Sequence, residues 1–243
     1  MTRASAPVAA LVLTVFVVLT AVAGCSDTDS DAEDTDKPIG ALTSEQIATA
    51  VLQPENLGDG WESEPATKDE GSTAPGCLAD LEALTDQLEA EEQGGTEFTF
   101  GEVLTVESTV SAYADETQIE AIFDQVQTVA AACAGVTGTD DDGNEWNLTL
   151  TTSDDAVYDD VDDQYSVSGS GTLTTPSGAD VQVHIETTAV RLGPNVASVS
   201  TFDFEERTTE HRAWTEIAIE RFVDVAEGEE PGSETAPAPG AAA

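Results

Sequence analysis

The chain has 243 residues, of which 49 are acidic and seven are basic, so its formal net charge is −42 at pH 7. A polyanion of this strength repels nucleic acid and anionic lipid headgroups, which excludes both as direct partners. The length and an apolar fraction of 40% suffice for one domain with a sizeable core. The excess of acid also suits a high-salt environment, where ions screen repulsion between like charges; a soluble surface is the simpler alternative.

Residues 1–24 have the features of a secretory signal peptide. Arg3 precedes an apolar run from Val8 to Val22, which is shorter than the roughly 18 residues of a membrane-spanning helix. The order Val-Ala-Gly-Cys at positions 22–25 resembles the lipobox of bacterial lipoproteins, and ordinary cleavage after Ala23 is the alternative. The lipobox interpretation predicts a lipoprotein acylated on Cys25 with palmitate-type chains, held at the outer face of the cell membrane.

Composition divides the rest of the chain into three parts. Residues 25–38 are mostly Ser, Thr, Asp and Glu, which predicts a disordered acidic tether. Residues 39–227 form a single globular domain. Residues 228–243 consist largely of Glu, Pro, Gly and Ala, and we expect a disordered tail there.

The cysteine count fits an oxidising compartment outside the cytoplasm. If Cys25 carries lipid, Cys77 and Cys133 remain as a pair, and we predict a disulfide between them. A bond closing a loop of this length would stabilise the fold by about 4 kcal/mol in the chain-entropy model.

Periodic patterns predict both helices and strands. Capping patterns at Thr43 and Asp115 begin two helices, and Trp214 lies in a last amphipathic helix. Leucines spaced by three and four residues predict another helix, which begins beside Cys77 and ends at Gly94-Gly95. Alternating apolar residues predict one long strand over 98–113, bent near Gly101, and four further strands. These four are expected at residues 145–152, 164–174, 181–192 and 196–204. The expected fold class is α+β, an antiparallel sheet of about five strands with helices packed mainly on one face.

Several segments together resemble a known domain. They are Leu57 to Trp61 (Leu-Gly-Asp-Gly-Trp), Cys77 ahead of a helix, the strand 106–113, and a helix that ends at Cys133. This combination resembles the extracellular sensor domain of the mycobacterial receptor kinase PknH, over about residues 39–227. The resemblance implies an antiparallel sheet flanked by helices, a cleft for an unidentified ligand, and no enzyme activity. The kinase sensor has two disulfides whereas this chain has cysteines for one, which puts a transferred ligand site in doubt.

No pattern in the sequence predicts catalysis, a metal site or a cofactor. The run Asp140 to Glu145 lacks the end ligands of a calcium loop and is interpreted as a hairpin turn. The acidic pairs between Asp154 and Asp163 would hold a cation only weakly. We expect His184 on a sheet surface or in the core and His211 on the surface of the last helix.

The sequence therefore favours a lipid-anchored, non-enzymatic binding or sensor-like module outside the cell. Its partners would be the membrane, through the anchor, and an unknown small molecule or envelope protein, but not nucleic acid. The alternatives are a hydrolase that uses paired carboxylates and a scaffold protein of the envelope. With both long helices expected on one sheet face, we predict a ligand surface on the other face, at Tyr113, His184, Glu186 and Arg191. The cleft between helices and sheet is the second choice.

Overall fold

The computed structural model describes residues 38–66, 75–85, 87 and 89–240. The signal peptide, Cys25 and the acidic tether lie outside the described residues. Within the described part of the chain, no helix is long and apolar enough to cross a membrane.

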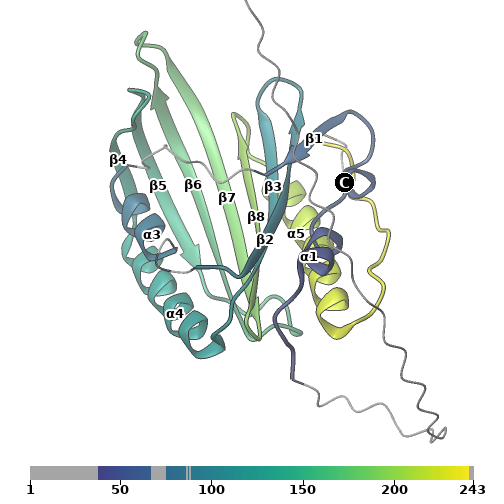
Figure 1. Cartoon of the computed structure of the whole chain (residues 1–243). Helices are drawn as coiled ribbons and strands as arrows, with labels where there is room; N and C mark the ends of the chain where they lie inside the picture. Colours follow the sequence, from purple (N-terminus) through teal and green to yellow (C-terminus); the bar gives the residue numbers. More distant parts are fainter. Residues whose placement is uncertain (1–37, 67–74, 86, 88, 241–243) are drawn as a thin grey trace, which may run out of the picture. The chain divides into compact units, whose positions relative to one another are not determined.

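Eight strands form one antiparallel sheet in the order β1-β2-β3-β8-β7-β6-β5-β4 (Figure 1). The strands are β1 (Trp61–Pro65), β2 (Glu92–Phe100), β3 (Leu104–Ala112), β4 (Gly135–Thr139), β5 (Glu145–Ser153), β6 (Asp163–Thr174), β7 (Asp180–Leu192) and β8 (Asn195–Asp203). The helices are α1 (Ser44–Ala50), α2 (Pro54–Leu57), α3 (Cys77–Thr85), α4 (Glu116–Ala132) and α5 (Thr208–Glu227). The α+β class is confirmed, but the expected number of about five strands is too low.

The long strand expected over 98–113 is a hairpin. It turns at residues 101–103, where Gly101 has φ +69°, so that Phe100 of β2 pairs with Leu104 of β3. The turn falls inside the apolar alternation, which therefore continues across it and looks like one element. The helix expected to end at Gly94 and Gly95 ends at Thr85, and both glycines lie within β2. A side chain at Gly95 would approach the Ser108 carbonyl oxygen to 2.9 Å, so these glycines allow close strand and helix packing.

The helices cover opposite faces of the sheet, so the expectation that they pack mainly on one face is wrong. Thr188 and Ala189 are neighbours on β7 and point to opposite faces. Thr188 is hydrogen-bonded to His211 of α5 at 3.2 Å. Ala189 lies across from Tyr165, whose ring packs against Phe123 of α4 with centroids 5.2 Å apart. One apolar stripe shows that a helix packs on a sheet but not on which face.

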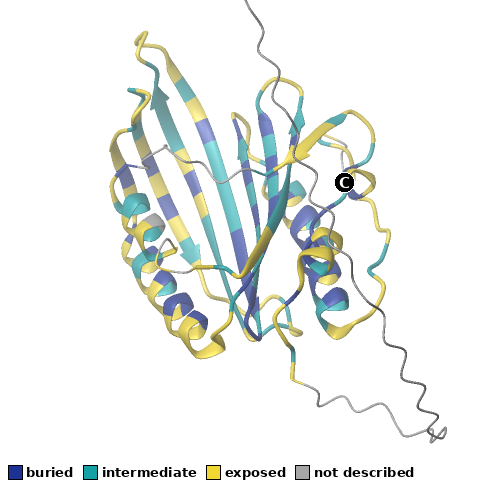
Figure 2. Cartoon of the chain, viewed as in Figure 1, coloured by how far each residue is buried: buried dark blue, intermediate teal, exposed yellow. Residues whose placement is uncertain are grey.

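Each helical layer covers about half of the sheet. Helices α1, α2 and α5 pack against the half formed by β1, β2, β3, β8 and β7, whereas α3 and α4 pack against β4, β5 and β6 on the other face (Figure 1). Buried residues accordingly concentrate along β3, β8 and β7, while the outer turns of α4 are exposed (Figure 2). The two faces have separate cores. Trp214 and Phe98 are fully buried in the first, and Val136 and Val183 in the second.

The predicted disulfide between Cys77 and Cys133 is confirmed, with the two Cα atoms 5.7 Å apart. It ties the first residue of α3 to the end of α4. The expected capping interactions are also present, since the Thr43 hydroxyl accepts from Gln46 N and the Asp115 carboxylate accepts from Gln118 N.

Residues 228–240 differ from the disordered tail that composition suggests. The amide of Ala236 donates to the Asn56 carbonyl at 2.8 Å, and the Asn56 side chain donates to the Glu234 carbonyl at 2.8 Å. Arg221 of α5 donates to the carbonyl oxygens of Thr49, Val51 and Gly232. The segment is therefore packed on the domain, because backbone hydrogen bonds and one buried alanine fix a sequence that has few apolar residues.

Candidate functional site

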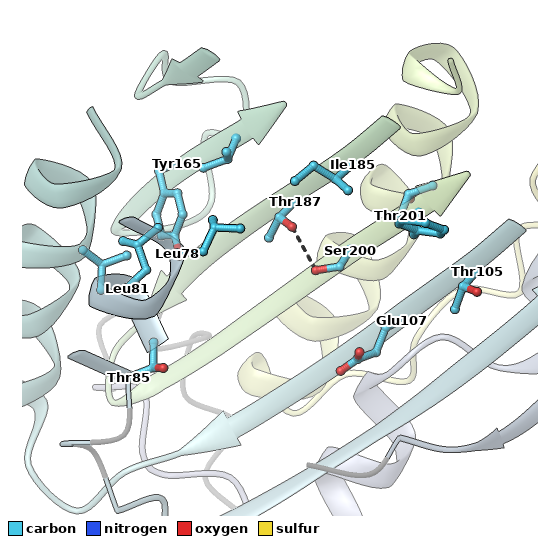
Figure 3. Close-up of a pocket in the computed structure, with 13 residues that line it drawn as sticks. Leu78, Leu81, Thr85, Thr105, Glu107, Tyr165, Ile185, Thr187, Ser200 and Thr201 are labelled. Carbon is cyan, nitrogen blue, oxygen red and sulfur yellow. Dashed lines mark hydrogen bonds between the residues drawn. The ribbon is translucent and has the colours of Figure 1, made fainter. Parts of the chain in front are cut away.

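The candidate site is a half-open pocket between helices α3 and α4 and the sheet face below them, here called the α3–α4 pocket (Figure 3). Its volume is about 660 Å³, within the roughly 300–1,000 Å³ usual for small-molecule sites. It is lined by Leu78, Leu81 and Thr85 of α3, Val126 of α4, Tyr165 and Val167 of β6, Ile185 and Thr187 of β7, Ser200, Thr201 and Phe202 of β8, and Thr105 and Glu107 of β3.

The alternation of side chains along the strands determines which residues form the floor of the pocket. Ile185 and Thr187 of β7 share the face of Ala189, and their cross-strand partners on β8 are Phe202 and Ser200. The next pairing places Glu107 of β3 directly across from Ser200. A single row across the sheet therefore carries Glu107, Ser200 and Thr187. The hydroxyls of Thr187 and Ser200 are hydrogen-bonded to each other at 3.0 Å, as Figure 3 shows.

The roof of the pocket is apolar. Leu78 and Leu81 of α3 point toward the sheet in Figure 3, and Val126 adds the contribution of α4. The disulfide holds the start of α3 beside α4, which fixes the position of these leucines. Apolar lining residues on both roof and floor, including Leu81, Val167 and Phe202, are only half-buried, so they leave apolar surface in contact with water. An apolar ligand would remove that surface from water.

Tyr165 contributes an aromatic ring to the wall of the pocket. Burial raises the pKa of its phenol to about 12, so the hydroxyl keeps its proton at physiological pH. Among the lining residues that the structure describes, Glu107 is the single carboxylate, and histidine, lysine and cysteine are absent. The pocket can thus bury apolar groups and exchange hydrogen bonds with hydroxyls, but it lacks a pair of groups for acid–base catalysis.

The architecture matches a solved extracellular domain. The extracellular domain of PknH from Mycobacterium tuberculosis superimposes with a TM-score of 0.56 at 13% identity, covering 79% of this chain and 100% of that one. The chain shares its fold with the PknH extracellular domain. A protein from Mycobacterium smegmatis, an Rv0999 ortholog described as uncharacterised, gives a TM-score of 0.40 at 12% identity and covers 75% of this chain and 97% of its own. No family model and no curated protein matches the sequence.

The resemblance to the PknH extracellular domain predicted from sequence is therefore confirmed at the level of the fold. At 13% identity, the likeness places no individual ligand-binding residue.

The four residues predicted as one ligand surface do not share a face. Arg191 is buried: its Nη2 lies 2.6 Å from Asp163 Oδ2 and its Nη1 lies 3.3 Å from Asp162 Oδ2. It points to the α4 face with Tyr165, whereas His184 and Glu186 point to the α5 face. Tyr113 follows the end of β3, beyond the strand. The prediction of a common surface is wrong because it assumed both long helices on one side.

Acidic residues that the sequence analysis considered as cation ligands have protein partners instead. Asp162 and Asp163 hold Arg191, and Asp162 also accepts from the Gly193 amide at 2.6 Å. Asp140 accepts from Asn144 N and Trp146 Nε1, as expected of a hairpin turn. In the described ranges, no group of three or more His, Cys, Asp or Glu side chains is placed to bind a metal ion.

A second hollow, of about 270 Å³, contains Glu186 and His211. Burial raises the pKa of the Glu186 carboxyl, which accepts a hydrogen bond from Thr208 at 2.7 Å. His211 is buried, contrary to the surface position expected, and hydrogen-bonds Thr188 and Thr201 through its two ring nitrogens. Burial lowers its pKa to about 4, so the ring is neutral. Both ring nitrogens are engaged by hydroxyls of the core, which assigns His211 a packing role.

The residues that line the α3–α4 pocket were missed from sequence, apart from the general choice of a cleft between helices and sheet. One signal was present. In β3, polar residues alternate strictly with the buried set, so that Thr105, Glu107 and Thr109 share a face. Their convergence with Ser200 and Thr187 depends on strand pairing between residues far apart in sequence, which no local pattern contains.

Proposed function

We propose that this protein is a lipid-anchored, extracytoplasmic binding module of the sensor-like kind, which holds a small ligand in the α3–α4 pocket and carries out no chemistry on it. The observation that carries the proposal is the pocket itself. Apolar side chains only half-buried around a 660 Å³ hollow, with a single carboxylate among the described lining residues, are typical of a binding site.

The fold supports an extracytoplasmic role. The structure with the shared architecture is an extracellular domain, and the Cys77–Cys133 disulfide is the kind of bond that persists in an oxidising compartment. Such a bond is uncommon in cytoplasmic proteins, and the signal-like residues 1–24 would deliver the chain to the outside.

The lipid anchor rests on the lipobox order at positions 22–25. A chain with a net charge of −42 gains nothing from electrostatic attraction to anionic membranes. Membrane residence would therefore depend on the acyl chains, of which two suffice for stable anchoring.

Bound compounds provide the direct test of the pocket. The full chain is purified from membranes of the expressing bacterium, extracted with organic solvent, and compared by mass spectrometry with a Val167→Trp variant whose indole fills the pocket floor. A compound enriched in the wild type and depleted in the variant is the expected result. Equal extracts from two equally well-folded proteins would contradict ligand binding at this site.

The anchor is tested separately with Cys25→Ala. This variant should leave the membrane fraction and lose incorporation of labelled palmitate, whereas Cys77→Ala should still incorporate the label. A Cys25→Ala protein that stays in the membrane and keeps the label would disprove the lipobox assignment.

A further inference from the structure

The α3–α4 pocket is divided into an apolar part and a polar part. Under α3 and α4 the lining side chains are almost entirely apolar, and Figure 3 places Leu78, Leu81 and Tyr165 together at that end. Farther along the same sheet face, beyond the cover of the helices, β8 and β3 contribute the polar residues Ser200, Thr105 and Glu107, with Phe202 of β8 as the apolar exception. The division follows the edge of the helical layer.

Strand spacing gives the length of this divided site. The lining residues come from β6, β7, β8 and β3, which are adjacent in the sheet. Three steps of strand spacing span about 14 Å. A molecule that fills the pocket is thus elongated across the strands, with one end beside Tyr165 and the other beside Glu107.

Hydroxyl groups dominate the polar end. Thr187 and Ser200 are joined by a hydrogen bond of 3.0 Å, and Thr109 and Ser198 on the same sheet face are joined at 2.8 Å. A hydroxyl both donates and accepts, so each joined pair retains capacity for a further hydrogen bond. Such a surface matches a headgroup that carries several hydroxyls.

The electrostatic surroundings disfavour an anionic headgroup. Glu97 of β2 lies on the same sheet face, one strand beyond the last strand that lines the pocket. The whole chain adds a net charge of −42. A fatty-acid carboxylate placed here would meet like charges, which costs binding free energy.

We infer that the ligand is a single-tailed amphiphile with no anionic group, whose apolar tail lies beneath α3 and α4 and whose hydroxyl-rich headgroup lies over Ser200, Thr187 and Glu107. Sugar-headed and glycerol-headed lipids of one chain belong to this class. The inference rests on the proposed binding function and adds the chemical class of the ligand.

The test is competition against a neutral fluorescent probe. N-phenylnaphthylamine is added to the full chain carrying Cys25→Ser, and decyl glucoside, decanoate and decylamine are compared as competitors below their micelle concentrations. Decyl glucoside should displace the probe at about one-tenth of the decanoate concentration. Decanoate competing equally well or better would overturn the exclusion of an anionic headgroup, and decylamine doing so would overturn the assignment of a hydroxyl-rich one.

Variants separate the headgroup from the tail. A Thr187→Val/Ser200→Ala double variant should weaken decyl glucoside about tenfold and leave probe affinity unchanged. The matched control is Thr149→Val, an exposed threonine on the opposite face of β5, which should change neither. Unchanged glucoside affinity in the double variant would refute recognition of the headgroup by this row.

The binding function can fail independently of the ligand class. If the wild type does not bind the probe, or if Val167→Trp and Leu81→Trp both bind it as the wild type does, the pocket is not a binding site. If both variants lose the probe while decanoate competes as well as decyl glucoside, the pocket stands and only the ligand class is wrong. Circular dichroism of each variant establishes that the fold is retained.

Discussion

Removal of the Cys77–Cys133 disulfide should lower the free energy of unfolding by about 4 kcal/mol. The bond joins residues 56 positions apart, and closing a loop of that size in the unfolded chain accounts for this value in the chain-entropy model. For a domain of this length the loss corresponds to a fall in melting temperature of about 10 °C.

The measurement compares oxidised and reduced protein in urea. All samples carry Cys25→Ser, so that the two remaining cysteines are those of the disulfide. Cys133 is buried, and replacing it removes packing as well as the bond. The reduced wild-type pair therefore isolates the effect of the cross-link, and Cys77→Ala/Cys133→Ala shows the sum of both losses. Identical unfolding midpoints for oxidised and reduced protein would refute the argument.

The same reduction should weaken the α3–α4 pocket before it unfolds the domain. Helix α3 has nine residues and carries Leu78 and Leu81, and its first residue is fixed to the end of α4 by the disulfide. Helices this short are unstable alone in water. Probe affinity should therefore fall on reduction in the absence of urea, and an unchanged affinity would show that packing alone holds the roof.

Three further predictions follow from buried groups. Arg221→Met should lower the free energy of unfolding by at least about 2 kcal/mol in urea titration, because three carbonyl oxygens of Thr49, Val51 and Gly232 lose a charged donor. Deleting residues 229–243 should cost about 1–2 kcal/mol through the loss of the hydrogen bonds at Asn56, whereas a disordered tail would cost nothing. The pKa of His211 falls from 6.5 to about 4 on folding, so the unfolded chain takes up the proton first as pH drops. Stability should decline between pH 6.5 and 4 by up to about 3 kcal/mol, and His211→Gln should flatten that decline; equal slopes in both proteins would contradict it.

The elements predicted from sequence are those whose burial pattern is strong. Strand β8 and helix α4 each bury one side with a clear period, and capping at Asp115 marks the helix start. Strands β1 and β4 were missed for a physical reason. They lie at the two edges of the sheet, and their sequences, Trp-Glu-Ser-Glu-Pro and Gly-Val-Thr-Gly-Thr, contain one large apolar residue each. Their place in the sheet comes from pairing with a neighbour and not from their own propensity.

The candidate site was harder to predict because it depends on which face each helix covers. Periodicity identifies Phe123 as part of an apolar stripe, but its contact with Tyr165 follows from the path of the chain between them. The buried ion pair of Arg191 with Asp163 depends equally on strand pairing. A charged residue in a strand looks solvent-exposed in the sequence, and only the register reveals a partner that makes its burial possible.

Because each helical layer covers only about half of the sheet, the α3–α4 pocket has an apolar part and a polar part. Strands β7 and β8 face α5 on one side with buried residues such as Val190 and Val199, so this region of the sheet must be kept dry on that side. On the other side, α3 and α4 reach only as far as β6, and the lining changes across the strands, from Tyr165 and Val167 of β6 to Ser200 of β8 and Glu107 of β3. Beyond the helices an apolar side chain such as Phe202 stays partly exposed to water, whereas hydroxyls such as that of Ser200 remain hydrated there. The boundary is thus fixed by the folding of the protein itself. A ligand that lies across this boundary adds apolar surface beneath the helices and stays hydrated at its other end. An amphiphile therefore fits the pocket, whereas a uniformly apolar or uniformly polar molecule would place groups of the wrong polarity in one part of it.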